Sequence, residues 1–380
     1  MKPVSAGPTT YLSSRSGKIC AAVFACLAAF GLDALLFRSG LYTSILDPDS
    51  STGQFELILR REQKAQAGGA RNLVATVGNS RMAFSPKTLD RQGLSKQYEL
   101  RAAGIAGSNA RVWYYMLRDL DPTRRRYRAV VIALDDYDDE DRAGDPADDI
   151  AELHYVIARL RLSDVWTFAH SFDDPKLVRQ ALRDTILKGL VFQQDVRAFL
   201  ADPLHRFEYV ELCDQGYAGW TYDFLETTKN LAGLRIDWSN LEVTFPPGTD
   251  DEQRATVKSF LAHTPDLQTG RLAAYRRLWL GRIVDLYQGS DTKIILLRLP
   301  RGPIPRPDSL AVKSKGATRQ LARRPNVLLA DEHAFDSVEH PEFFKDGMHL
   351  NREGIDRFSV LLEKEVARLL GPPDRNVAVK

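Results

Sequence analysis

Ser80 is the first residue whose type and position could carry chemistry. It follows a short apolar run, Asn72-Leu-Val-Ala-Thr-Val-Gly78, and stands in the turn Gly78-Asn79-Ser80-Arg81. An apolar run rich in β-branched residues and closed by Gly is typical of a buried parallel strand, and ligands bind at the carboxyl ends of such strands. A serine at the start of a following helix can expose its hydroxyl as a nucleophile, beside backbone N–H groups that face an oxyanion. A serine at a strand–helix junction is also a common helix N-cap, so Ser80 alone establishes no activity.

Asp346 and His349 form a second candidate pair, in the stretch Asp346-Gly-Met-His349 that precedes the last predicted helix. A carboxylate three residues from a histidine on a loop can lie beside the imidazole, orient it and stabilise its positive form. A general base for a serine nucleophile needs this arrangement. The alternative interpretation is an exposed loop built on the turn-forming Asp-Gly dipeptide.

Taken together, the two features are more specific than either alone, because the serine comes first and the Asp-x-x-His stretch comes last. In this order the chain resembles the SGNH (GDSL-like) hydrolase superfamily: Gly78-Asn79-Ser80 matches the first block of the family, and Asp346 with His349 matches its last. The surrounding residues 343–351 resemble the membrane-anchored bacterial branch, which includes relatives of polysaccharide (alginate) O-acetylation proteins and of the D-alanyl transfer protein of teichoic acid. The resemblance covers roughly residues 70–135 and 290–370.

The resemblance implies a role for each matched residue. Ser80 is expected to be the nucleophile, His349 the general base and Asp346 its orienting partner. The backbone N–H groups of Ser80 and Gly107 are expected to form the oxyanion hole, because Gly107 fits the second block of the family better than Gly104 does. We expect no cofactor, because no P-loop or dinucleotide glycine fingerprint occurs, and no metal, because the other histidines lack metal-ligand spacing.

The third block departs from the family pattern. It is usually Gly-x-Asn-Asp, whose asparagine donates to the oxyanion, whereas this chain reads Leu134-Asp-Asp-Tyr-Asp138. Carboxylates would repel an oxyanion, so we expect the hydroxyl of Tyr137 or the amide of Asn109 to donate instead. Losing one oxyanion donor typically costs about 10²–10³ in rate. The departure therefore lowers the expected rate of hydrolysis.

Alternating strands and helices are expected to position these residues. The fold class is therefore α/β, a flavodoxin-like three-layer sandwich with a mostly parallel sheet. Residues 149–288, which lie between the third and fourth strands, are expected to be a mostly helical insertion. The predicted strands are residues 72–78, 98–103, 129–134, 293–299 and 327–330, and the predicted helices include 55–66, 112–120 and 354–370.

The N-terminal region contains one apolar segment, residues 19–37, interrupted only by Gly31 and Asp33. About 20 apolar residues span a bilayer as a helix, and Lys2, Arg15 and Lys18 before it predict a cytoplasmic N-terminus. We therefore expect a single-pass signal anchor in a bacterial inner membrane, with the remainder in the periplasm. A cleaved signal peptide and a buried soluble helix are the alternatives.

The predicted organisation follows from these segments. Residues 1–18 are the cytoplasmic N-terminus, 19–37 the transmembrane anchor and 38–70 a juxtamembrane link. Residues 71–370 are the SGNH-like α/β domain, and 371–380 a flexible tail.

Composition excludes two classes of protein. The chain has 52 Lys plus Arg against 50 Asp plus Glu, a net charge of +2, which argues against a nucleic-acid partner. Three cysteines are too few for a disulfide scaffold.

The stretch 135–149 holds nine acidic residues and is predicted to be a solvated loop, with a divalent cation site as the alternative. Arginine-rich stretches around residues 124–128 and 298–324 are either solubilising surface or a surface for an anionic glycan or lipid head group.

The function predicted from these observations is that of a serine acyl-ester hydrolase or O-acyltransferase, with acetyl as the expected acyl group. Its expected partners are an acylated or acceptor glycan and a membrane-bound O-acyltransferase. The alternatives are a non-catalytic or weakly catalytic subunit of a polysaccharide modification or export complex, and a periplasmic lipase. A short distance between Ser80 and His349 would favour the enzyme, and a long one the binding subunit.

Overall fold

A five-stranded parallel sheet is the centre of the computed structural model, which describes residues 15–67, 72–94, 97–137, 150–215, 227–262, 271–307 and 316–372. The strand order is β2-β1-β3-β6-β7, and every neighbouring pair is parallel. This is the order of flavodoxin-like sheets, in which the chain reverses its direction of travel across the sheet between β1 and β3. The predicted α/β class with a parallel sheet is confirmed. The strands are β1 (Leu73–Val77), β2 (Glu99–Ala102), β3 (Ala129–Leu134), β6 (Lys293–Arg298) and β7 (Val327–Leu329).

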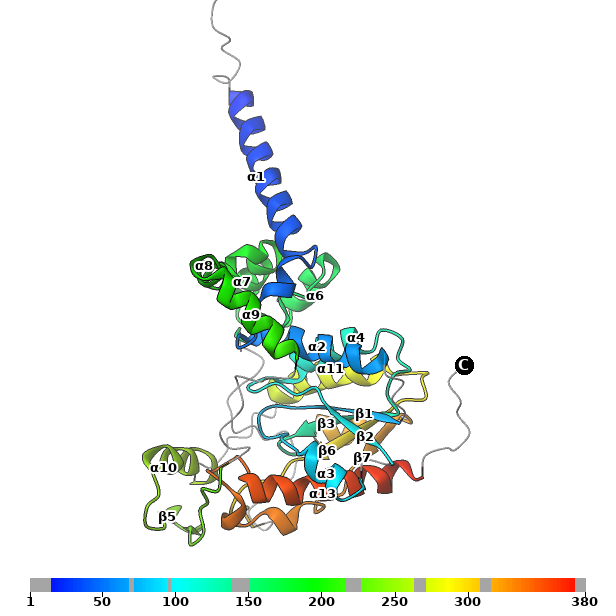
Figure 1. Cartoon of the computed structure of the whole chain (residues 1–380), viewed down its shortest axis with the longest axis vertical. Helices are drawn as coiled ribbons and strands as arrows, with labels where there is room; N and C mark the ends of the chain where they lie inside the picture. The colour runs from blue at the N-terminus through cyan, green and yellow to red at the C-terminus, as the bar shows by residue number, and fades with distance from the viewer. Residues whose placement is uncertain are drawn as a thin grey trace, which may run out of the picture.

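Helices cover both faces of the sheet (Figure 1). One face packs against α2 (Ser51–Ala67), α4 (Ala110–Leu120) and α11 (Arg271–Leu286), and the other against α3 (Pro86–Arg91) and α13 (Arg352–Leu370). Alternation along the strands explains this arrangement, because successive side chains point to opposite faces. In β1, for example, Ala75 and Val77 belong to the first core and Val74 belongs to the second. The result is a three-layer sandwich.

Residues 38–67, which make up most of the region expected to be a link, are folded into the domain. A short 3-10 helix at Tyr42–Ile45 is followed by α2, which is longer than the predicted helix 55–66. Phe55 and Leu59 on α2 are buried in the same core as the sheet. Apolar side chains on one face of α2 therefore make it part of the sandwich.

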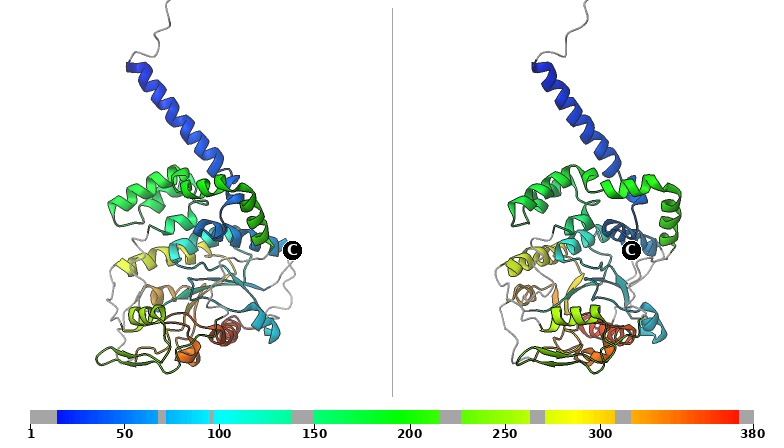
Figure 2. Two further views of the ribbon diagram at one scale, coloured as in Figure 1. Left: turned by 60° about the vertical axis from the view of Figure 1, so that its left-hand side comes forward. Right: turned by 90° about the vertical axis from the view of Figure 1, so that its left-hand side faces the viewer.

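The insertion divides into two parts on opposite sides of the sheet (Figures 1 and 2). The first part begins with α5 (Glu152–Val156) and continues into the segment 162–214. We call the segment 162–214 the cap; it lies between the sandwich and the N-terminal helix. The second contains the hairpin β4 (Arg235–Asp237) and β5 (Glu242–Thr244), with α10 (Asp251–Val257). The predicted insertion 149–288 also includes α11, but α11 covers the sheet and belongs to the sandwich. The cap contains α6 (Val165–Ala169), α7 (Pro175–Ile186), α8 (Gln193–Ala201) and α9 (Pro203–Asp214), with 3-10 turns at 162–164 and 188–190.

The N-terminal helix α1 (Arg15–Phe37) extends away from the domain (Figure 1). Its residues Gly17–Phe37 are long and apolar enough to cross a membrane, and 23 helical residues extend about 34 Å. The cap lies where α1 meets the rest of the chain (Figure 2). Residues 1–14, most of the acidic stretch 135–149 and most of the predicted tail lie outside the described residues.

Candidate functional site

Ser80 lies three residues beyond the end of β1, at the carboxyl edge of the sheet and at the point where the strand order reverses. Two glycines allow the turn to pack closely. A Cβ on Gly78 would lie 2.9 Å from the Cβ of Ala133, and a Cβ on Gly104 would lie 2.8 Å from the carbonyl oxygen of Gly78. Ser80 does not begin a helix. Helix α3 begins at Pro86, and the side chain of Ser85 caps it. The N-cap interpretation of Ser80 is therefore wrong.

The loop that carries Asp346 and His349 is held from three directions. At its end, the side chain of Asn351 accepts a hydrogen bond from the Gly354 N–H and caps α13. Within it, the Lys345 N–H donates to the carbonyl oxygen of His349 at 2.9 Å. From α10, the Nε2 of Gln253 donates to the carbonyl oxygen of Lys345 at 2.6 Å. The insertion thus supports the loop, a contribution that sequence patterns do not reveal.

These elements bring the three predicted catalytic side chains together. The Oγ of Ser80 lies 2.9 Å from the Nε2 of His349, and the Nδ1 of His349 lies 2.9 Å from the Oδ2 of Asp346. The serine and the histidine are 269 residues apart in the chain, so only the tertiary fold creates this contact. An imidazole whose Nδ1–H donates to a carboxylate presents an unprotonated Nε2 to the serine hydroxyl. The geometry is that of a nucleophile, its general base and an orienting carboxylate.

The environment of Asp346 favours its charged form. The side chain is buried, which by itself raises the pKa of the carboxyl group. The hydrogen bond and charge of His349, and two backbone N–H groups, outweigh that effect and lower the pKa below its usual value. These N–H groups belong to Met348 and His349, and each donates to Oδ1 at 2.8 Å. Asp346 is therefore an ionised partner for the imidazole.

The predicted oxyanion donors lie in the neighbouring turns. Gly107 has a φ of +67°, a left-handed conformation that favours glycine. In the part of the chain that the structure describes, neither the Ser80 N–H nor the Gly107 N–H donates a hydrogen bond. The side chain of Asn109 does not cap α4, although Asn109 occupies the cap position. Tyr155 on α5, which sequence reasoning missed, supports this turn because its hydroxyl donates to the carbonyl oxygen of Ala106 at 2.7 Å.

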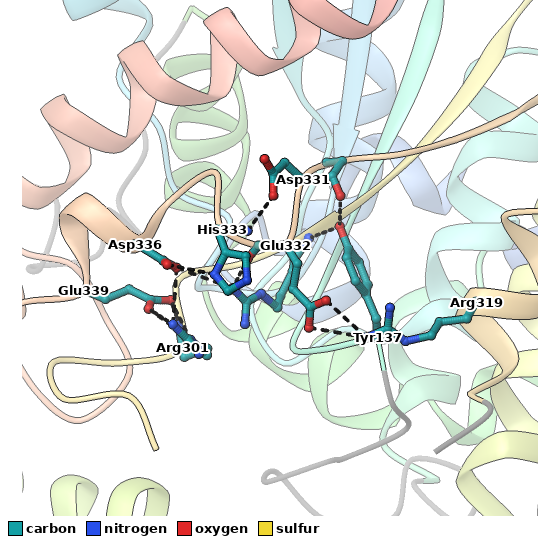
Figure 3. Close-up of polar contacts among 10 residues, drawn as sticks. Tyr137, Arg301, Arg319, Asp331, Glu332, His333, Asp336 and Glu339 are labelled. Carbon is teal, nitrogen blue, oxygen red and sulfur yellow. Dashed lines mark hydrogen bonds and ion pairs between the residues drawn. The ribbon is translucent and has the colours of Figure 1, made fainter. Parts of the chain in front are cut away.

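Tyr137 is not an oxyanion donor in this structure. Its side chain is fully buried, and its hydroxyl lies 3.1 Å from the carbonyl oxygen of Leu296 and 3.2 Å from that of Ala330 (Figure 3). The same hydroxyl accepts from the Arg298 N–H at 3.0 Å. These contacts tie the end of β3 to β6 and β7. The expectation for Tyr137 is therefore corrected: its hydroxyl serves the sheet, and Asn109 remains as the candidate side-chain donor.

The two aspartates that follow β3 are compensated by arginines. Asp135 pairs with Arg81 at 2.7 Å, and the side chain of Arg81 is only 7% exposed. Asp136 pairs with Arg276 of α11 at 3.5 Å. The repulsion expected from the third block is therefore offset by neighbouring positive charge. Arg81 directly follows Ser80 in the chain, so their proximity was readable from the sequence, whereas the pairing of Arg81 with Asp135 was not.

A cleft of about 580 Å³ opens beside Ser80. It runs from the Ser80 turn along the outer strand β2 to helix α2. Its walls are apolar near Ser80 and charged near α2, where Arg101 pairs with Glu62 and Glu99. The lining residues near the serine are Asn79, Met82, Ala83, Phe84, Leu89, Gly104 and Ala106. The cleft can hold the acyl or alcohol part of an ester.

In the second arginine-rich stretch, residues 298–324, two arginines are engaged in ion pairs. Arg301 pairs with Glu339 and Asp336, and Arg319 pairs with Glu332 (Figure 3). Arg301 lies in the loop after β6 and Arg319 on the short helix α12 (Ala317–Leu321), and both pair with the loop after β7, which supports the structural interpretation of this stretch. Across the described ranges, no group of three or more His, Cys, Asp or Glu side chains is placed to hold a metal ion.

Comparison with known proteins gives no assignment. No protein family model matches the chain, and no curated protein matches it. The site must therefore be interpreted from its own geometry.

Proposed function

We propose that this chain is a serine acyl-ester hydrolase or O-acyltransferase of the SGNH type, anchored in a bacterial inner membrane by α1 with its α/β domain in the periplasm. The observation that carries the proposal is the continuous pair of 2.9 Å contacts from Ser80 through His349 to Asp346. Its position at the carboxyl edge of a parallel sheet, where the strand order reverses, adds support. The Gly107 turn also supports it, because the Gly107 N–H donates no hydrogen bond within the described residues.

The mechanism follows from these groups. The Oγ of Ser80 attacks the ester carbonyl carbon while the Nε2 of His349 takes its proton. The ionised Asp346 stabilises the imidazolium, and the N–H groups of Ser80 and Gly107, with the Asn109 amide, donate to the oxyanion. The imidazolium then returns the proton to the leaving alcohol, and an acyl-serine remains. Water as acceptor completes hydrolysis, and a glycan hydroxyl completes transfer. We propose acetyl as the acyl group and a cell-surface or exported polysaccharide as the acceptor, with a membrane-bound O-acyltransferase as partner.

The alternative function, a non-catalytic binding subunit, depended mainly on the acidic third block. The pairing of Asp135 with Arg81 and of Asp136 with Arg276 weakens that argument. The short distance from Ser80 to His349 also favours catalysis over binding alone.

The proposal is tested with the full-length protein in detergent, using 4-nitrophenyl acetate and an acetylated glycan as acyl donors. We expect Ser80→Ala to reduce turnover by at least about 10³. Ser290→Ala is the matched control, because Ser290 follows α11 and its hydroxyl donates to the carbonyl oxygen of Tyr287 in the same turn. Adding an acceptor glycan separates transfer from hydrolysis. If Ser80→Ala equals the wild type on every donor, the chain is not this enzyme.

A further inference from the structure

The exposed large apolar side chains of the described residues gather near one end of the molecule. Outside α1 and the adjoining Leu41, eight of the nine lie in the cap, and the ninth is Leu278 on α11. Soluble surfaces normally carry such side chains singly, and a concentration of them marks an interaction surface. The eight residues are Leu162, Trp166, Ile186, Leu190, Leu200, Leu204, Phe207 and Leu212.

The most exposed members of this set are on three of the cap helices. Trp166 on α6 is 67% exposed, Leu200 on α8 is 71% exposed and Leu204 on α9 is 75% exposed. Helices α6 and α8 lie in the layer of the domain next to α1, and α9, which carries Leu204 in its first turn, runs from that layer toward α2 (Figures 1 and 2). Tryptophan and leucine are the residues that interfacial membrane helices place on their buried face.

The cap is fixed to the last turn of α1. The carboxylate of Asp33 accepts the Gly189 N–H at 2.7 Å and the Lys188 N–H at 3.2 Å. The ring of Phe37 stacks on Phe192 at a centroid distance of 5.3 Å. These contacts give the single acidic residue of α1 a structural role. They also prevent the cap from turning freely about the end of α1.

The depth of these contacts indicates what covers the cap. Asp33 lies four residues before the end of α1 at Phe37, which corresponds to about 6 Å along the helix axis. The 3-10 turn at 188–190 therefore lies level with the last apolar turn of α1. Interfacial helices bury their apolar face about 5–10 Å into the boundary between head groups and acyl chains. A bilayer that surrounds α1 thus reaches this part of the cap.

We infer that the cap is a second membrane-binding element, whose exposed apolar side chains enter the interfacial layer of the bilayer that α1 crosses. The occupant of this surface is lipid, because the surface is continuous with α1. The cap would hold the sandwich at a fixed height and orientation above the membrane. The inference depends on α1 crossing a membrane and is independent of the proposed enzyme activity.

The test uses the full chain with Cys20, Cys26 and Cys213 replaced by alanine. Single cysteines are introduced as Leu200→Cys or Leu204→Cys and labelled with an environment-sensitive nitrobenzoxadiazole dye. A chain that keeps only Cys26 reports on α1, and Leu278→Cys is the matched control for an exposed apolar position outside the cap. The protein is reconstituted in phosphatidylcholine vesicles with or without nitroxide groups near the head of the acyl chains. We expect the fluorescence of both cap labels and of the Cys26 label to fall at least about twofold, and that of the Leu278→Cys label to stay nearly constant.

Two results would overturn the inference. Cap labels that are quenched no more than the Leu278→Cys label, beside a quenched Cys26 label, show that α1 enters the bilayer and the cap does not. A Cys26 label that is not quenched removes the basis of the inference. The intrinsic fluorescence of Trp166 provides a second measurement that needs no cysteine substitutions. The same lipids should quench the intrinsic tryptophan fluorescence of the wild type more than that of Trp166→Phe, and equal quenching contradicts the inference.

Discussion

The ion pair between Arg81 and Asp135 allows the sharpest test of how this site is built. Its Nη1–Oδ1 distance is 2.7 Å, and the two side chains are 7% and 16% exposed. Removing one partner of a buried pair leaves an uncompensated charge and costs about 3–5 kcal/mol. Because both side chains keep some contact with solvent, we expect Arg81→Met to cost about 3 kcal/mol. At about 2–4 °C per kcal/mol, the melting temperature should fall by about 6–12 °C.

The same change should reduce activity. Arg81 directly follows Ser80, the proposed nucleophile, and its side chain also donates to the carbonyl oxygen of Pro300, so we expect its loss to loosen the Ser80 turn. A displacement of about 1 Å at a reacting group can cost about 10² in rate. The freed carboxylate of Asp135 would also repel the developing oxyanion. We therefore expect kcat/KM for 4-nitrophenyl acetate to fall by about 10².

The double variant Arg81→Met/Asp135→Asn removes both charges and decides the cause. We expect it to regain most of the lost melting temperature and at least about tenfold in kcat/KM relative to Arg81→Met, because coupled neighbours are not additive. Arg324→Met is the control, since its pair with Asp285 is exposed and such pairs contribute about 0–1 kcal/mol. If Arg81→Met behaves like Arg324→Met, or if Asp135→Asn restores nothing, the reasoning fails.

Three further predictions concern the imidazole, the oxyanion turn and the cap. Asp346→Asn should lower kcat by about 10²–10⁴, because an amide that donates to Nδ1 leaves the proton on the nitrogen facing Ser80; kinetics with 4-nitrophenyl acetate measure this. Gly107→Ala should lower both activity and stability, because φ is +67° and its Cβ would lie 3.0 Å from the Tyr155 hydroxyl. Gly289→Ala is the control, because Gly289 has a φ of +78° and an added Cβ would have no atom within 4 Å. We expect it to lower the free energy of unfolding by about 1 kcal/mol and to leave activity intact. Burial, aided by Arg38, lowers the pKa of Lys188 to about 7 from its ordinary 10.5. The unfolded chain then binds more protons between these values, so stability should rise with pH by up to about 1.4 kcal/mol per unit above pH 7, and melting curves of Lys188→Met should lose this rise.

Each of these predictions has a contrary outcome. Full activity of Asp346→Asn would show that the carboxylate does not orient the imidazole. Equal activity of Gly107→Ala and Gly289→Ala would remove the Gly107 turn from the site. A melting temperature with the same pH dependence in the wild type and Lys188→Met would show that Lys188 is charged in the folded protein.

Local sequence determined the elements of this protein and the types of its candidate catalytic residues. The runs 129–134 and 294–297 are apolar throughout and rich in β-branched residues or leucine, which favours strands covered on both faces. The Asp-x-x-His spacing also explains the contact between the side chains of Asp346 and His349, because both residues lie on one turn. The backbone N–H groups of Met348 and His349 in this turn donate to the Asp346 carboxylate. The apolar helix α1 is similarly a local property of residues 17–37.

Tertiary structure decided what these residues touch across long stretches of chain. The carboxylate of Asp135 lies next to Arg81, and that of Asp136 next to Arg276 on α11, so an acidic block that suggested repulsion is electrostatically compensated. Tyr137, like Asp135 and Asp136, follows strand β3. Its side chain is buried, and its hydroxyl contacts the backbone at β6 and just after β7. The local sequence of helix α2 and of the cap does not show what they pack against, and only the tertiary structure shows that α2 belongs to the sandwich and that the cap contacts α1. Pairing between distant residues depends on the strand order of the sheet, which is set by the balance of all core contacts together and not by any local pattern.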